Sequence, residues 1–169
     1  MKQYHFWENP FKKGTAHSEN ELVFLSSVPI FDSLSKRQQI KLQKIIHIRS
    51  YEKGEVIFRQ GDPGVGLYIV KEGEVEVYNE YSDLTCRKIT ILRQGDFFGE
   101  TSLLNETPRS ATIVSANSSI LWGLFKPDLL NLLDSDPKLG VRLIFRLSQI
   151  VAERLRLLND AFCGIENET

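Results

Sequence analysis

The sequence predicts a mainly β fold, a double-stranded β-helix or jelly-roll barrel, with N-terminal helices before it and two C-terminal helices after it. Between Tyr51 and Phe125, apolar residues recur with a period of two, which is the spacing of half-buried strands. Glycine-containing turn signals separate these short runs, as in all-β barrels and jelly rolls. On both sides of this segment the apolar spacing changes to that of helices.

The length and composition are those of one ordinary globular domain. The chain has 169 residues, of which 41% are hydrophobic and 25% are charged, and its formal net charge is −1. This balance excludes a strongly basic domain that binds the phosphate backbone of nucleic acids. No run approaches the roughly 18 apolar residues of a membrane span. Cys86 and Cys163 are too few for a disulfide scaffold, so we expect a cytoplasmic protein with reduced thiols.

Residues 1–20 are expected to be an N-terminal arm, and residues 21–169 the domain proper. The arm fits neither periodic template, and it carries Phe6, Trp7 and Phe11, more aromatic residues than a disordered tail would have. It either packs on its own domain or docks a partner.

Residues 21–50 are expected to be a helical lead. Ser35 followed by Gln38 is typical of a capping box, in which each side chain satisfies the other residue's free backbone N–H. Ile40, Ile45 and Ile46 follow with roughly helical spacing.

Residues 51–125 are expected to form the barrel. The expected strands cover 56–58, 67–70, 75–77, 89–91, 111–114 and 120–125. Turn signals separate them at 61–64, 73, 79–83 and 95–96.

Residues 126–163 are expected to be two closing helices. Pro127 suits the start of the first, and Asp136 with Pro137 suits the N-cap and first position of the second, which Gly164 would end. The long apolar stripe of the second helix consists of Leu143, Leu147, Ile150, Val151, Leu155, Leu158 and Phe162. Beyond Val151 this stripe could pair with a second copy as a short coiled coil, although Arg154 would interrupt the seam. The sequence therefore leaves a homodimer as an open alternative.

The segment from Phe97 to Thr112 carries the most chemical information. Gly99 permits a ligand to approach the backbone closely, and the residues after it can form a short helical turn with free N–H groups. Arg109 could place its planar fork on a phosphate, and Ser110 adds a hydroxyl. Glu100 accepts hydrogen bonds only, which suits sugar hydroxyls rather than phosphate. The segment could hold a phosphate and a ribose together.

Gly-Glu-x-x-Leu followed by Pro-Arg-Ser-Ala-Thr resembles the phosphate-binding cassette of cyclic-nucleotide-binding domains, which occur in catabolite activator proteins, cyclic-nucleotide-dependent kinases and gated channels. The likeness extends over residues 22–160. It includes Gly61-Asp62, the 67–70 strand, the Arg93-to-Glu100 lead into the cassette and both closing helices.

The resemblance implies a role for each cassette residue. Glu100 would hold the ribose 2′-hydroxyl, and Arg109 would pair with the exocyclic oxygens of the cyclic phosphate. Ser110 would offer its hydroxyl to the phosphate or to a guanine amino group. Backbone N–H groups would complete the anion site near Gly99, Thr101, Ser102 and Ala111. The family often has an aliphatic residue where Thr101 stands and an alanine where Ser102 stands.

The base pocket is less closely defined. The candidates for its apolar floor are Val77, Ile89 and Phe97. In the family a residue of the last helix caps the base, and the candidates here are Arg154, Leu155 and Leu158. The movement of that helix is the family's output.

We therefore expect a non-catalytic sensor that binds cyclic AMP, with cyclic GMP as the less favoured ligand, and that needs no cofactor. The histidines, His5, His17 and His47, all precede the expected strands, which argues against a metal site of cupin type. No kinase motif and no recognition helix for DNA is evident, so we expect an unknown protein effector, no direct DNA binding and no membrane contact. The alternative is a nucleotide-free jelly roll that serves as a scaffold for protein–protein interaction.

Overall fold

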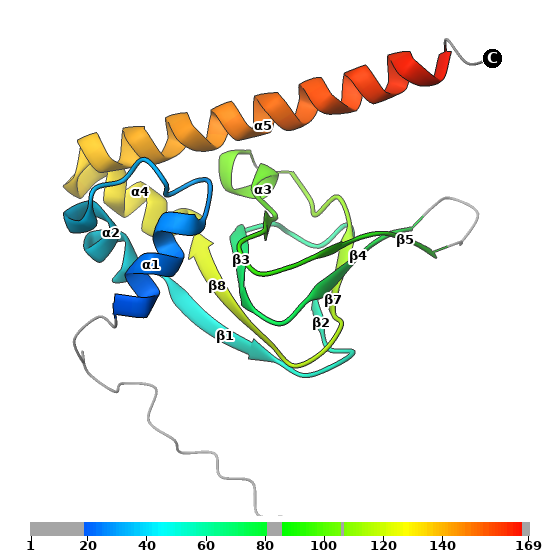
Figure 1. The fold of residues 1–169 in the computed structure, drawn as a ribbon, viewed down its shortest axis with the longest axis horizontal. Helices are drawn as coiled ribbons and strands as arrows, with labels where there is room; N and C mark the ends of the chain where they lie inside the picture. The colour runs from blue at the N-terminus through cyan, green and yellow to red at the C-terminus, as the bar shows by residue number, and fades with distance from the viewer. Residues whose placement is uncertain (1–18, 81–85, 106, 167–169) are drawn as a thin grey trace, which may run out of the picture.

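The computed structural model describes residues 19–80, 86–105 and 107–166 (Figure 1). Most of the expected N-terminal arm, residues 1–18, lies outside the described residues. The helices are α1 (Glu19–Ser27), α2 (Lys36–Gln43), α3 (Thr101–Leu104), α4 (Lys126–Ser135) and α5 (Pro137–Glu166). The strands are β1 (His47–Tyr51), β2 (Val56–Phe58), β3 (Gly66–Glu72), β4 (Val75–Glu80), β5 (Cys86–Leu92), β6 (Phe97–Phe98), β7 (Thr112–Ser115) and β8 (Ser119–Phe125).

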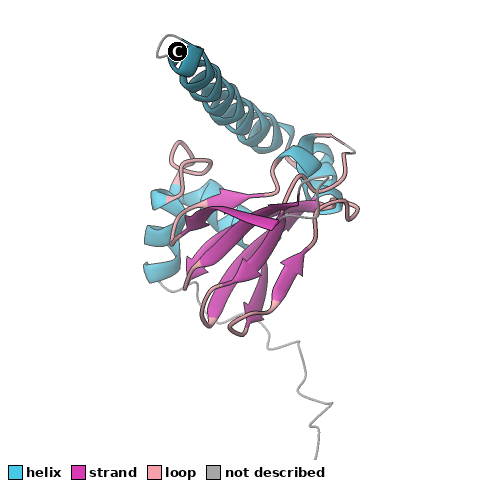
Figure 2. Cartoon of the chain, turned by 90° about the vertical axis from the view of Figure 1, so that its right-hand side faces the viewer, coloured by secondary structure: helices cyan, strands magenta, loops and turns pink. Residues whose placement is uncertain are grey.

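The strands form two antiparallel sheets, which confirms the mainly β class with flanking helices (Figure 2). One sheet has the order β1-β8-β3-β6 and the other β2-β7-β4-β5. Strand β3 of the first sheet is buried on both faces, whereas β1 at the edge of that sheet is exposed. Leu67 and Ile69 point to the core shared with the helices, while Val70 packs in a second core with Val75 and Ile113 of the other sheet. The period of two therefore divides β3 between two apolar layers.

The helical lead is shorter than the sequence pattern predicts. The capping box of Ser35 and Gln38 is present at the start of α2, but α2 ends at Gln43 and β1 begins at His47. The interpretation of residues 47–50 as helical is wrong because β8 pairs with this segment, with His47 opposite Gly123 and Tyr51 opposite Ser119. Such pairing between distant segments overrides local pattern.

The two closing helices begin where the capping signals place them. The N–H of Leu139 donates to the Asp136 carboxylate at 3.3 Å, and Pro137 is the first residue of α5. A hydrogen bond from Lys41, reinforced by this N–H, lowers the pKa of Asp136. Gly164 does not end α5, which continues to Glu166. Among the described helices, none is long and apolar enough to cross a membrane.

The two halves of α5 have different surroundings. Leu139, Leu143 and Leu147 are almost fully buried against the helical core, and Ile150 packs at its edge. The helix then continues past α3 and projects beyond the sheets (Figure 1). The first half is thus anchored in the core, and the second half lies beside the cassette.

Candidate functional site

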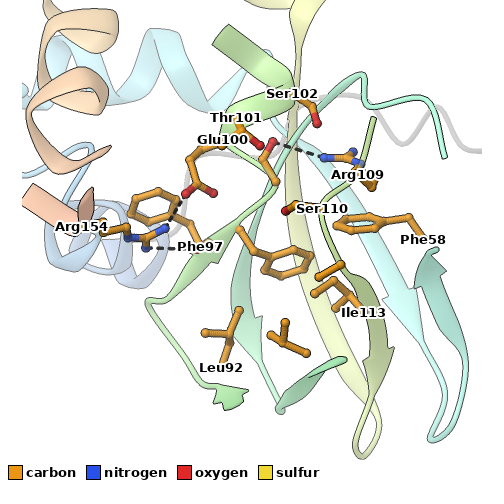
Figure 3. Close-up of a pocket in the computed structure, with 14 residues that line it drawn as sticks. Phe58, Leu92, Phe97, Glu100, Thr101, Ser102, Arg109, Ser110, Ile113 and Arg154 are labelled. Atoms are coloured by element: carbon orange, nitrogen blue, oxygen red, sulfur yellow. Dashed lines mark hydrogen bonds and ion pairs between the residues drawn. The ribbon is translucent and has the colours of Figure 1, made fainter. Parts of the chain in front are cut away.

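A pocket of about 370 Å³ opens between the second sheet, the cassette and α5 (Figure 3). Its volume lies within the range of sites for small ligands. The lining residues are Phe58, Val77, Leu92, Phe97, Phe98, Gly99, Glu100, Thr101, Ser102, Arg109, Ser110, Ala111, Ile113 and Arg154. Labelled polar side chains gather at one end of the pocket, and Leu92 and Ile113 lie toward the other (Figure 3). The structure therefore brings all seven cassette candidates to one cavity.

Arg109 is a buried cation, with only 4% of the residue exposed. Its Nη1 donates to the carbonyl of Gly66 at 2.7 Å and to that of Gly99 at 3.2 Å. Its guanidinium carbon lies 4.0 Å from the centre of the Phe58 ring. The Nε–H is buried and has no partner within the described part of the chain. Burial lowers the pKa of Arg109, because desolvation disfavours the charged form.

These facts leave the charge of Arg109 incompletely satisfied. No described carboxylate lies within ion-pair distance of its guanidinium, so carbonyl dipoles and an aromatic face are its neighbours. A buried charge without an ionic partner is costly. An anion in the pocket would relieve that cost.

Gly99 is needed where it stands for two reasons. Its φ of +77° lies in the left-handed region that side chains rarely adopt. A Cβ at this position would also overlap Nη1 of Arg109. The glycine therefore lets the arginine reach the backbone of the cassette.

Glu100 is joined to the last helix through Arg154. Nη1 of Arg154 donates to Oε1 of Glu100 at 2.7 Å, and Nη2 donates to the carbonyl of Phe97 at 3.3 Å. The guanidinium also lies 4.2 Å above the Phe97 ring (Figure 3). The Glu100 side chain is 14% exposed, and Oε2 remains to accept a further hydrogen bond. One carboxylate thus faces the pocket and holds α5 at the same time.

The side chains of α3 contribute less than its backbone. Ser102 is buried, and its hydroxyl donates to the carbonyl of Thr107 at 3.3 Å. This hydroxyl hydrogen is therefore already engaged within the protein rather than offered to a ligand. Thr101 is exposed at the rim. The first N–H groups of a helix have no acceptor within it, so they suit a polar ligand. Ser110 and Ala111 line the pocket from the bend that leads into β7.

The floor of the pocket is apolar and comes largely from residues that sequence patterns did not single out. Ile113 of β7 pairs with both Phe58 of β2 and Val77 of β4, so three strands meet there. Leu92 completes the floor from β5. Of the expected floor residues, Val77 and Phe97 line the pocket. The alternation of apolar residues in the sequence predicts which residues of each strand point inward. Only the pairing of the strands places those residues under the cassette.

Ile89 does not line the pocket, and 54% of it is exposed. Thr90 pairs with Val77 and Leu92 with Val75, so these two residues of β5 share the face of the buried Val75, and the register then shifts, because the next pair joins Lys88 to Tyr78. Ile89 is the extra residue at this irregularity and has no partner on β4, so Leu92 takes the place in the pocket floor that the sequence pattern assigned to Ile89.

Leu155 and Leu158 also stay outside the pocket, with 58% and 57% of each residue exposed. Leu155 is rotated by about 100° from Arg154 around the helix, and Leu158 lies about one turn farther along α5 than Arg154. Of the three cap candidates, Arg154 alone lines the pocket.

The arrangement suits a small ligand that has an anionic end, hydroxyl groups and a flat apolar part. Arg109 and the cassette backbone offer donors, Glu100 offers an acceptor, and the floor offers apolar contacts. No group of three or more His, Cys, Asp or Glu residues that could hold a metal ion occurs in the described ranges.

Known proteins share this pattern. The family model for the cyclic nucleotide-binding domain matches residues 48–136. A cAMP-dependent protein kinase regulatory subunit of Pyricularia oryzae is 36% identical over 92 residues, which cover 54% of this chain and 23% of that protein. A cGMP-dependent protein kinase of Plasmodium berghei is 39% identical over 92 residues, which cover 54% of this chain and 10% of that protein. The chain therefore spans a small part of these relatives.

The crystal structure of the Thermus thermophilus catabolite activator protein has a similar fold. The TM-score is 0.74 at 31% sequence identity, and the match covers 82% of this chain and 63% of that one.

Proposed function

Because this chain belongs to the cyclic nucleotide-binding domain family, we propose that it is a non-catalytic sensor module that binds cyclic AMP in the pocket beside Arg109 and signals by movement of α5. The observation that carries the proposal is the buried guanidinium of Arg109, which has an unpartnered Nε–H and no described ion-pair partner. A cyclic phosphate would supply the missing acceptor and the opposite charge.

Glu100 is proposed to accept the ribose 2′-hydroxyl. Its Oε1 is engaged by Arg154, and Oε2 is available to a second donor. Backbone N–H groups near Gly99, Thr101, Ser102 and Ala111 would complete the phosphate site, and the buried Ser102 would act through its backbone only.

The purine is proposed to lie on Val77, Leu92 and Ile113, with Arg154 and the Phe97 ring at its edge. The preference for cyclic AMP over cyclic GMP depends on Ser110. Its hydroxyl could donate to the phosphate with either nucleotide, or accept from the amino group that only guanine carries. Relatives named for cyclic AMP and for cyclic GMP both match the chain, and these matches do not separate the two nucleotides. We propose cyclic AMP because the cassette and the segment leading into it resemble those of the activator proteins.

The signal is proposed to pass from the ligand to α5 through Glu100 and Arg154. A ligand that contacts Glu100 changes the environment of the carboxylate that holds the helix. If the nucleotide binds one position of α5 more tightly, it shifts the population toward that position. A protein effector in the cytoplasm, rather than DNA, would read the change.

Calorimetric titration of nucleotide-free protein with cyclic AMP, cyclic GMP and 5′-AMP tests the proposal. We expect micromolar or tighter binding of cyclic AMP, weaker binding of cyclic GMP and little for 5′-AMP. Truncating one partner of a buried charge pair costs about 2–5 kcal/mol. Arg109→Ala should therefore weaken binding by about 30-fold or more. Arg109→Lys should also weaken binding, because lysine keeps the charge but loses the fork.

Arg93→Ala is the matched control. Arg93 is an exposed arginine that pairs with Glu74 on the surface, and its removal should leave binding unchanged. Absence of heat with every nucleotide, on folded and empty protein, would favour the scaffold alternative. Strong binding that survives Arg109→Ala would refute the assigned site.

A further inference from the structure

Three hollows of the surface follow one another from α1 to the first turns of α5. Their volumes are about 370, 560 and 590 Å³, which lie within the range of binding pockets. The first and second hollows share Asp32, and the second and third share Arg142 and Phe145. We call this continuous surface the helical band, and its course is marked by Val23, Asp32, Lys36, Val141, Arg142 and Phe145.

Polar contacts hold the helical band in one shape. Arg146 of α5 donates to the carbonyl of Pro29 at 3.0 Å and to the carboxylate of Asp32 at 2.6 Å. Arg142 donates to the side chain of Gln38 at 3.1 Å. The connection between α1 and α2 therefore lies against the first turns of α5 (Figure 1). A segment that docks on this surface finds it already formed, which lowers the cost of binding.

The helical band exposes large apolar side chains along its whole length. Val23 is 69% exposed at the α1 end, and Val141 and Phe145 are 60% and 65% exposed on α5. None of the three belongs to either hydrophobic core of the described chain. Exposed apolar surface that continues over several elements marks an interaction site.

The sequence before α1 has the composition of a segment that covers such a surface. Residues 1–18 lie outside the described residues and lead directly into α1. Tyr4, Phe6, Trp7 and Phe11 make four of the eight residues from 4 to 11 aromatic, whereas 10% of the whole chain is aromatic. Aromatic side chains are enriched at the core of protein interfaces.

The length of this segment fits the distance that it would have to cover. Phe11 precedes Glu19 by eight residues and Tyr4 precedes it by fifteen, so an extended chain reaches about 26 Å and about 50 Å. Helix α1 has nine residues and spans about 13 Å, and the connection after it touches α5. Gly14 permits a reversal of the chain before α1. Residues 4–11 can therefore fold back along α1 as far as Phe145.

The charges of the two surfaces are complementary. The residues that line the helical band include the cations Lys36, Lys138, Arg142 and Arg146, against the single carboxylate of Asp32. Within residues 4–11, Glu8 is the one Asp, Glu, Lys or Arg residue. An aromatic segment with one negative charge thus matches an apolar surface with a basic rim.

We propose that residues 4–11 dock on the helical band of their own chain, with their aromatic rings over Val23 and Phe145 and with Glu8 toward the basic rim. Docked there, the segment bridges α1 and α5 across their contact at Asp32. Of the two alternatives that the sequence left for the N-terminal arm, this is packing on its own domain. The proposal is independent of nucleotide binding.

Acrylamide quenching of the fluorescence of Trp7 in the full chain tests the proposal. The chain has two tryptophans, and Trp122 is 2% exposed in the core, so a Trp7→Phe variant supplies the Trp122 signal to be subtracted. Docking shields the Trp7 ring, and we expect its quenching constant in the native chain to lie well below that in the urea-unfolded chain. Equal quenching of Trp7 in the two states would overturn the proposal.

Substitutions in the helical band test where the segment docks. Phe145→Glu places a charge in the band and should lower the docking equilibrium constant by about tenfold, which raises the quenching of Trp7. Val23→Glu should act in the same way from the α1 end. Leu157→Glu is the matched control, because Leu157 is 54% exposed on the same helix, about 18 Å beyond Phe145 and outside the band. If neither band substitution raises the quenching, or if Leu157→Glu raises it as much, the band is not the docking surface.

Charge reversal and dilution complete the test. Glu8→Lys brings a like charge to the basic rim and should raise the quenching of Trp7, whereas Lys2→Glu, outside residues 4–11, should not; equal effects would refute the charge match. Docking within one chain does not depend on protein concentration, so the quenching constant should hold over about a hundredfold dilution. Shielding of Trp7 that disappears on dilution would show that a second molecule supplies the contact, and would overturn docking within the chain. Circular dichroism of each variant establishes that the domain is folded.

Discussion

Replacing Arg154 with methionine should loosen the distal half of α5 from the barrel. Arg154 donates to Glu100 at 2.7 Å and to the Phe97 carbonyl at 3.3 Å, and it lies 4.2 Å above the Phe97 ring. Its side chain is 42% exposed, so the ion pair belongs to the weak surface class, at about 0.2–1 kcal/mol. The cation–π contact adds about 0.5–1 kcal/mol. Together they amount to about 0.7–2 kcal/mol, or about 3- to 30-fold in an opening equilibrium.

Hydrogen exchange of the amides at 148–158 in ligand-free protein measures this opening. We expect Arg154→Met to lower their protection by that factor, and the buried strands to keep theirs. Arg156→Met is the control, because Arg156 pairs only with Glu153 and Asp160 of its own helix among the described residues. If Arg154→Met leaves exchange at 148–158 unchanged, or if both substitutions act equally, the contact with Glu100 does not hold the helix.

Three further predictions concern stability. Gly99→Ala should destabilise the fold by about 1–3 kcal/mol in urea unfolding and weaken nucleotide binding, because φ is +77° and the new Cβ meets Arg109; wild-type stability would contradict this. Ser35→Ala should cost about 1 kcal/mol, or a Tm drop of about 2–4 °C, by removing the capping box of α2; an unchanged melting curve would count against it. Burial, with Tyr68 nearby, raises the pKa of Tyr51 from 10.0 to about 12. The contribution of the neutral Tyr51 side chain to the free energy of unfolding is therefore complete below pH 10.0 and is lost as pH rises toward 12. Across that interval the unfolding free energy of the unmodified chain should fall relative to Tyr51→Phe, and parallel curves would refute the shift.

Local signals in the sequence were sufficient wherever neighbours along the chain decide the structure. The capping box of Ser35 and Gln38 and the start of α5 after Asp136 depend on residues within one helical turn. The cassette candidates from Gly99 to Ala111 lie within one short segment, and the turn between two strands brings them to the same pocket.

Tertiary structure decided the points at which distant segments meet. His47–Tyr51 is a strand because β8 pairs with it, and no pattern within residues 21–50 contains that partner. The choice of Leu92 over Ile89 at the pocket floor follows from the register between β4 and β5. A shift of one residue moves a side chain to the other face of a sheet, so apolar character alone leaves the choice open.

The two faces of α5 give the same lesson for a helix. The sequence by itself determined that the helix is long and carries an apolar stripe, and it named Arg154, Leu155 and Leu158 together as cap candidates. Only the packing of Leu143 and Leu147 on the core set the rotation of the helix. That rotation turns Arg154 toward Glu100 and leaves Leu155 exposed, because neighbouring residues on a helix point about 100° apart.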